Sequence, residues 1–88
     1  MKVSELLSDE SKWTTRYLSR NKNDNPVYYD DNDACKWCLL GAMLKCYEHN
    51  GYEKVFCLTQ RTIGGLIGTF NDASSYEQVM KLVRELDI

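Results

Sequence analysis

The chain has 88 residues, of which 43% are hydrophobic and 27% charged, and its formal net charge at pH 7 is -2. This composition is typical of a folded domain and argues against disorder over the whole chain. Nucleic-acid binding needs clustered Lys and Arg, and the only basic cluster, Arg16, Arg20 and Lys22, is small. We therefore expect a single domain over residues 1–88 that does not bind nucleic acid directly.

The N-terminal residues contain acidic positions and no apolar run, so they do not predict a secretory signal. No later apolar stretch is long enough to span a bilayer. We therefore expect a cytoplasmic protein without membrane contact. Its four cysteines should then stay reduced: Cys35, Cys38, Cys46 and Cys57.

Residues 3–18 predict a short helix, a turn and a second helical turn. Ser8 or Asp9 is placed to cap the second turn, and Trp13 should anchor the segment to the core. The apolar positions of this segment gather on one helical face, which indicates packing against the rest of the chain.

Residues 19–33 are rich in Asn and Asp and hold the only proline, so they predict a long loop. A two-stranded element near residues 27–29 is an option that the sequence leaves open. Tyrosine anchors flanked by acidic side chains are typical of protein-binding surfaces, although acidic side chains in a loop also serve solvation alone. The candidate partner-binding residues are Asp24, Tyr28, Tyr29, Asp30 and Asp31.

Residues 34–49 predict a buried central helix, because apolar side chains fall on almost every side of a 3.6-residue helix. Asn32 or Asp33 should provide its N-cap. Gly41 lowers helix propensity unless its missing side chain lets another element approach the backbone closely.

A second helix is expected after residues 50–51, where Asn-Gly is a C-cap signal, and it should begin near Glu53. Beyond Thr62, several glycines lower the helix propensity. The sequence leaves open whether residues 62–70 are helical or bend the chain.

A turn at Asn71-Asp72 and a capping box that begins at Ser74 or Ser75 should precede the last helix. Residues 76–86 carry an apolar stripe on one face and charges on the other, so this helix should pack on the central helix. Taken together, the elements predict a mainly α fold.

The cysteines do not predict a metal site. On one helix Cys35 and Cys46 would lie about 16 Å apart, too far to share a zinc ion. A nucleophile at Cys38 would need His49, the only histidine, which would lie equally far along that helix. We therefore expect buried structural thiols, no metal, no cofactor and no enzymatic activity.

Four short segments, Trp13-Thr14, Trp37-Cys38, Gly41-Ala42 and Asn71-Asp72, resemble the motifs of a family of small uncharacterised domains from phages and bacteria. The family pattern has an early tryptophan followed by threonine, a Trp-Cys-x-x-Gly-Ala segment and an aromatic-Asn-Asp turn. Phe70 stands where tryptophan is more usual. The resemblance implies a phage origin and carries no known enzyme activity.

Two hypotheses follow. The first is a small phage-derived protein that binds a host protein and inhibits it by steric occlusion, for example as an anti-CRISPR or other anti-defence inhibitor. The alternative is a small-ligand-binding or cysteine-dependent enzyme domain in which Trp13, Cys38, Asn71 and Asp72 surround a polar pocket.

Overall fold

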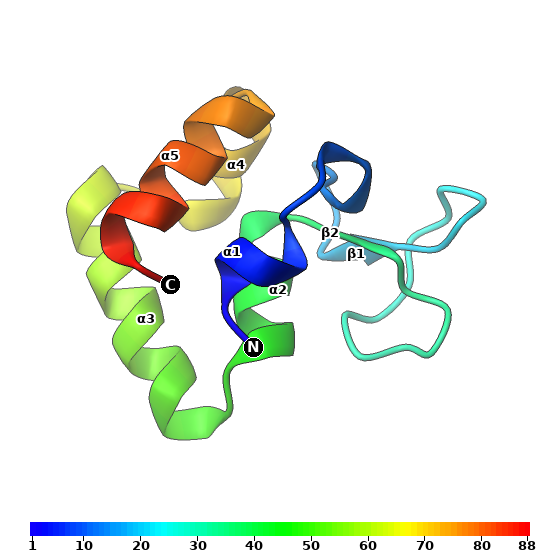
Figure 1. Ribbon diagram of the computed structural model, residues 1–88, viewed down its shortest axis with the longest axis horizontal. Helices are drawn as coiled ribbons and strands as arrows, with labels where there is room; N and C mark the ends of the chain where they lie inside the picture. Colours follow the sequence, from blue (N-terminus) through cyan, green and yellow to red (C-terminus); the bar gives the residue numbers. More distant parts are fainter.

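The computed structural model describes the backbone of residues 1–88 and the side chains of all of them except His49. Five α-helices and a small antiparallel sheet confirm the mainly α class. In Figure 1 the helices α3, α4 and α5 lie on one side of the molecule, and the strands with their long loops lie on the other. The elements are α1 (Val3–Leu6), a 3-10 turn (Glu10–Lys12), β1 (Ser19–Arg20), β2 (Lys36–Trp37), α2 (Leu39–Cys46), α3 (His49–Ile63), α4 (Ile67–Ala73) and α5 (Tyr76–Leu86).

The N-terminal segment has the predicted arrangement of a short helix, a turn and a second helical turn. The Asp9 carboxylate accepts a hydrogen bond from the Ser11 N–H at 2.9 Å and so caps the 3-10 turn. Val3 and Leu6 of α1 are buried, and Trp13 packs against the same core. The predicted cap and anchor are therefore confirmed.

The predicted central helix over residues 34–49 is wrong in its limits, because α2 covers only Leu39–Cys46. Lys36 and Trp37 form strand β2, Cys38 is extended, and the Cys35 N–H donates to the Arg20 carbonyl at 2.9 Å. The N-cap is Cys38, whose sulfur accepts the Gly41 N–H at 3.3 Å, and not Asn32 or Asp33. Backbone pairing with a distant segment has replaced the first turn of the predicted helix.

The two-stranded element also differs from the expectation near residues 27–29. Its strands are β1 and β2, which run antiparallel with Ser19 opposite Trp37 and Arg20 opposite Lys36. Val27 donates its N–H to the Ser19 carbonyl at 3.2 Å but belongs to neither strand. Residues 21–35 form the connection between β1 and β2.

The second half of the chain corrects two predictions and decides a third point that the sequence left open. Residues 50–51 lie inside α3 and do not end a helix. Gly64 ends α3 with φ of 67°, and the chain bends at residues 64–66. Gly68 lies inside α4, so residues 62–70 combine both options that the sequence left open. Asn71 and Asp72 belong to α4 and do not form a turn.

The last helix lies where it was predicted. Ser75 caps α5 through a capping box with Gln78. The helix packs mainly against α1 and not, as predicted, on the central helix α2, although buried residues of both helices belong to the same core cluster. The chain ends are tied together there, because the Ser4 N–H donates to the Ile88 carbonyl at 3.0 Å and Lys2 pairs with Asp87.

The core combines residues from α1, β2, α2, α4 and α5. Trp37 lies in it at 7% exposure, as expected for this residue, although it belongs to a strand. The buried cluster consists of Val3, Leu6, Leu7, Trp37, Leu39, Ala42, Met43, Ile67, Val79, Met80, Leu82, Val83 and Ile88. Across the part of the chain that the structure describes, no helix has the length and apolar character needed to cross a membrane.

Gly41 is the point of closest approach between α2 and the segment before β1. A Cβ atom at Gly41 would lie 1.9 Å from the carbonyl oxygen of Leu18, a backbone atom. This approach lets the Cys38 N–H donate to the same oxygen at 3.1 Å. The predicted use of Gly41 for close approach is confirmed.

We expect Gly41→Ala to lower the free energy of unfolding by about 3 kcal/mol, because the methyl group can be accommodated only by moving backbone. Gly51→Ala is the matched control, since its Cβ would meet only the Tyr47 side chain at 3.6 Å, an ordinary contact. In a helix that substitution should be neutral or stabilising by up to roughly 1 kcal/mol. Urea denaturation of both variants measures the difference, and equal effects would contradict the close approach.

Candidate functional site

The first candidate site is the polar cluster around Asn71, which is fully buried. Its side-chain oxygen accepts two hydrogen bonds, one from the Trp13 indole N–H at 2.7 Å and one from the Leu39 N–H at 3.0 Å. The cluster therefore connects the N-terminal segment, the start of α2 and α4. Trp13 and Asn71, which the alternative hypothesis placed around a ligand pocket, are in direct contact.

The amide group of Asn71 makes the remaining contacts. It donates to the Thr14 carbonyl at 3.1 Å and to the Asp72 carboxylate at 3.3 Å. The same Asp72 oxygen accepts the Arg16 N–H at 2.8 Å. Since an Asn side chain offers two donors and one oxygen with two lone pairs, Asn71 uses its full capacity within the chain. The Asn71 side chain therefore has no free donor or acceptor with which to bind a ligand.

Cys38 lies next to this cluster but its thiol does not enter it. The sulfur caps α2, and burial raises the pKa of the thiol, with the charge of Asp72 acting in the same direction. A reactive cysteine needs a stabilised thiolate, and these conditions favour the neutral thiol. The arrangement of Trp13, Cys38, Asn71 and Asp72 is therefore suited to holding the fold and poorly suited to nucleophilic chemistry.

The other cysteines only partly fit the prediction of buried thiols. Cys35 and Cys46 are half-buried, and Cys57 is exposed, so for Cys57 the prediction is wrong. The spacing argument against zinc also needs correction, because Cys35 and Cys38 precede α2 and do not lie on it. Among the described side chains, no three potential metal ligands come together. The candidate base His49 falls outside these side chains.

The second candidate site is the loop between β1 and β2, which is ordered by its own side chains. The side-chain oxygen of Asn21 accepts the N–H groups of Asn23 and Asn25 at 2.9 and 3.0 Å. Asp24 has a positive φ of 63°, and its carboxylate pairs with Lys36 at 2.6 Å. This hydrogen-bonded pairing lowers the pKa of Asp24. The loop tip is thus held back onto β2.

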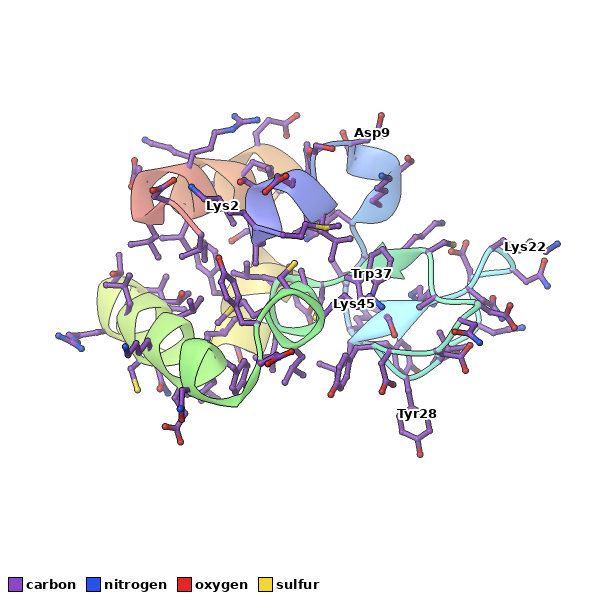
Figure 2. The ribbon with its side chains drawn as sticks, turned by 60° about the horizontal axis from the view of Figure 1, so that its bottom comes forward. Lys2, Asp9, Lys22, Tyr28, Trp37 and Lys45 are labelled. Atoms are coloured by element: carbon purple, nitrogen blue, oxygen red, sulfur yellow. The ribbon has the colours of Figure 1, made fainter. Side chains whose placement is uncertain are left out.

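The two tyrosines of this loop have different environments. Tyr28 is 80% exposed, and in Figure 2 its ring points away from the rest of the molecule. Tyr29 is half-buried against the core, and its carbonyl accepts the Trp37 indole N–H at 2.9 Å. The buried Ser19 hydroxyl donates to the Val27 carbonyl. Bonds on both sides therefore hold the backbone beneath Tyr28.

A surface hollow of about 450 Å³ lies beside Tyr28, lined by Pro26, Val27, Tyr28 and Asp31. The Asp31 carboxylate accepts the Asp33 N–H at 2.8 Å, and both Asp30 and Asp31 are exposed. Of the predicted partner-binding residues, Tyr28 and Asp31 line this hollow. Asp30 precedes Asp31 in the chain but is not among the lining residues. Asp24 is engaged with Lys36, and Tyr29 serves mainly as support.

Sequence reasoning missed Pro26 and Val27 as lining residues and Ser19 as the buried support of the hollow. The run Pro26-Val27-Tyr28 is the most apolar part of an otherwise polar loop, and this was the available signal. No local pattern indicated that Ser19 would be buried, because its environment depends on β1 pairing with β2.

Comparison of the chain with protein-family models, with curated proteins and with solved structures finds no match. The roles of the Asn71 cluster and of the Tyr28 hollow therefore have to be inferred from their own contacts. The hydrogen-bonding groups of Asn71 are all used within the chain, whereas the Tyr28 ring is left in solvent.

We expect Asn71→Ala to lower the free energy of unfolding by about 3 kcal/mol, because it leaves the buried Leu39 N–H and the partly buried Trp13 indole N–H without their acceptor. Asn50→Ala, at an exposed position of α3, is the control and should change stability by only tenths of a kcal/mol. Thermal and urea unfolding measure both. A minor effect at Asn71 would mean that the amide is free for another role.

Thiol labelling tests the environment of the cysteines. At mildly alkaline pH, iodoacetamide should modify Cys57 in the native protein well before Cys38, because Cys38 is buried and its raised pKa keeps it protonated. Peptide mapping after timed labelling gives the order, with Cys57→Ser as control for the mass assignment. Labelling of Cys38 as fast as Cys57 would instead favour the cysteine-enzyme hypothesis.

Proposed function

We propose that this protein works by binding another protein through the surface formed by residues 26–31, with Tyr28 as the anchor. The observation that carries the proposal is an aromatic ring left 80% exposed on a backbone that is held by hydrogen bonds. A tyrosine presented rigidly loses little conformational entropy on binding, which is why such residues are frequent anchors of interfaces.

The charges around Tyr28 define the face that a partner would offer. Asp30 and Asp31 are exposed, and neither takes part in the ion pairs of the described residues. Rim charges of one sign increase the association rate with a surface of the opposite sign. The expected partner therefore presents basic side chains around a site that accepts an aromatic ring.

In its narrower form, the proposal is that the partner is a host defence protein and that binding blocks its working surface. This version depends on the expectation of a phage origin, which is drawn from the Trp13-Thr14, Trp37-Cys38 and Asn71-Asp72 segments. Occlusion needs no catalytic group on the inhibitor, and the Asn71 cluster is occupied by structural hydrogen bonds.

The test starts from affinity capture with the purified protein in lysate of a bacterial host, followed by mass spectrometry and purification of the retained protein. Tyr28→Ala should weaken its binding about tenfold or more, as expected for an anchor, and leave unfolding unchanged within roughly 0.5 kcal/mol. Biolayer interferometry gives both rate constants. Retention of equal affinity by Tyr28→Ala would place the interface elsewhere.

A second variant separates charge from contact. Asp30→Asn with Asp31→Asn keeps the size of both side chains and their acceptor oxygens, so the loop should keep its conformation. Association should slow and lose much of its salt dependence, because screening acts on exposed charges over about 10 Å at moderate ionic strength. Glu85→Gln on the exposed face of α5 is the matched control. If the control shows the larger effect, α5 is the interface.

A further inference from the structure

The segment that joins Trp13 to β1 contains an unusual backbone conformation at Arg16, with φ of 75°. Three residues other than glycine have positive φ, and the other two are Asp24 and Asp87. Aspartate tolerates this region because its short polar side chain bonds to nearby backbone, whereas arginine has no such compensation. A strained position of this kind persists only where the surroundings hold it, and such positions concentrate at functional sites.

Buried parts of the fold hold the segment at both ends. The Thr14 N–H donates to the Trp37 carbonyl at 3.1 Å, and the Cys38 N–H donates to the Leu18 carbonyl at 3.1 Å. Between them, the Arg16 N–H donates to the Asp72 carboxylate at 2.8 Å. The absence of a side chain at Gly41 makes room for the Leu18 carbonyl. These contacts impose one conformation on the backbone of residues 14–18.

The side chains that this backbone presents are exposed. Tyr17 is 49% and Leu18 37% exposed, and Arg16 is exposed beside them. The Arg20 guanidinium lies 4.8 Å from the centre of the Tyr17 ring, which restrains that ring from one side. The ion pairs found among the described residues are Lys2–Asp87 and Lys36–Asp24, so none of the described carboxylates pairs with the Arg16 side chain.

We propose that Arg16, Tyr17 and Leu18 form a second protein-binding surface, which takes an acidic segment with an adjacent apolar side chain from another protein. Arg and Tyr are the residues most often found at the energetic centre of interfaces, and a rigid backbone lowers the entropy cost of binding them. The unpaired guanidinium of Arg16 selects a carboxylate, with which it forms a two-pronged hydrogen bond. This surface is distinct in its residues and in its charge from the Tyr28 surface.

A polynucleotide is the other polyanion that Arg and Tyr side chains recognise, and the charges of this chain disfavour it. The whole chain carries a formal net charge of -2, and the Asp72 carboxylate lies against the backbone of Arg16. Polynucleotide binding depends on several cations that neutralise successive phosphates. One exposed arginine beside a carboxylate is better matched to a single acidic group on a protein.

A random-peptide library displayed on phage provides a defined probe. Panning on the intact wild-type protein should enrich peptides with Asp or Glu next to an aromatic or aliphatic residue. A synthetic copy of the best peptide should bind Arg16→Asn about tenfold more weakly or worse, because a charge-assisted hydrogen bond is lost. Asn tolerates positive φ, so this variant should keep the fold, and circular dichroism and thermal unfolding check that it does. Tyr17→Ser should also weaken binding.

Arg61→Gln, which removes an exposed arginine on α3, is the control and should leave peptide binding unchanged. Failure to enrich acidic peptides, or equal binding by Arg16→Asn, would overturn the inference. So would an oligothymidine that binds more tightly than the peptide and is lost with Arg16→Asn, since that would assign the surface to nucleic acid. Tyr28→Ala should bind the peptide normally. Loss of peptide binding in Tyr28→Ala alone would overturn this inference and leave the Tyr28 proposal standing.

Discussion

The hydrogen bonds of the Asn71 side chain are the constraint on which the rest of the structure depends. One buried amide joins the Trp13 indole, the Leu39 N–H at the start of α2 and the Thr14 carbonyl. Buried polar groups must be satisfied, so a side chain that satisfies several at once places three segments relative to one another. The apolar core alone would not specify these positions, because hydrophobic contact is not directional.

The consequences extend to both candidate surfaces. With Leu39 placed by Asn71, α2 begins at Leu39 with Cys38 as its N-cap, and Gly41 faces the Leu18 carbonyl. That contact positions the Arg16–Leu18 segment, and β1 follows this segment directly in the chain. Pairing of β1 with β2 then buries Ser19, whose hydroxyl holds the loop that presents Tyr28. Both exposed aromatic groups are therefore carried by backbone that is fixed from within.

The two surfaces have opposite charge and share no residue. Asp30 and Asp31 surround the Tyr28 hollow, whereas Arg16 accompanies Tyr17 and Leu18. Cys38 and Asn71, the residues most suggestive of chemistry in the sequence, are instead engaged in capping and bridging. The buried polar groups therefore hold the backbone that carries the exposed side chains of the two proposed binding surfaces.

Local signals in the sequence determined the mainly α class, the burial of Trp37 and the close approach at Gly41. They also narrowed the first cap to Ser8 or Asp9 and the start of the capping box to Ser74 or Ser75, and the structure selected Asp9 and Ser75. Each of these signals depends on residues near one another in the chain or on the size of one side chain. Only the tertiary structure decided that residues 36–38 are extended and that residues 34–35 precede them outside any helix, because an apolar run fits a buried strand as well as a helix. The N–H groups of Cys35 and Cys38 donate to the carbonyls of Arg20 and Leu18, and Asn71 bonds to Trp13, which is 58 residues away in the chain. Such contacts leave no periodic pattern in the sequence, since their partners are brought together only by folding.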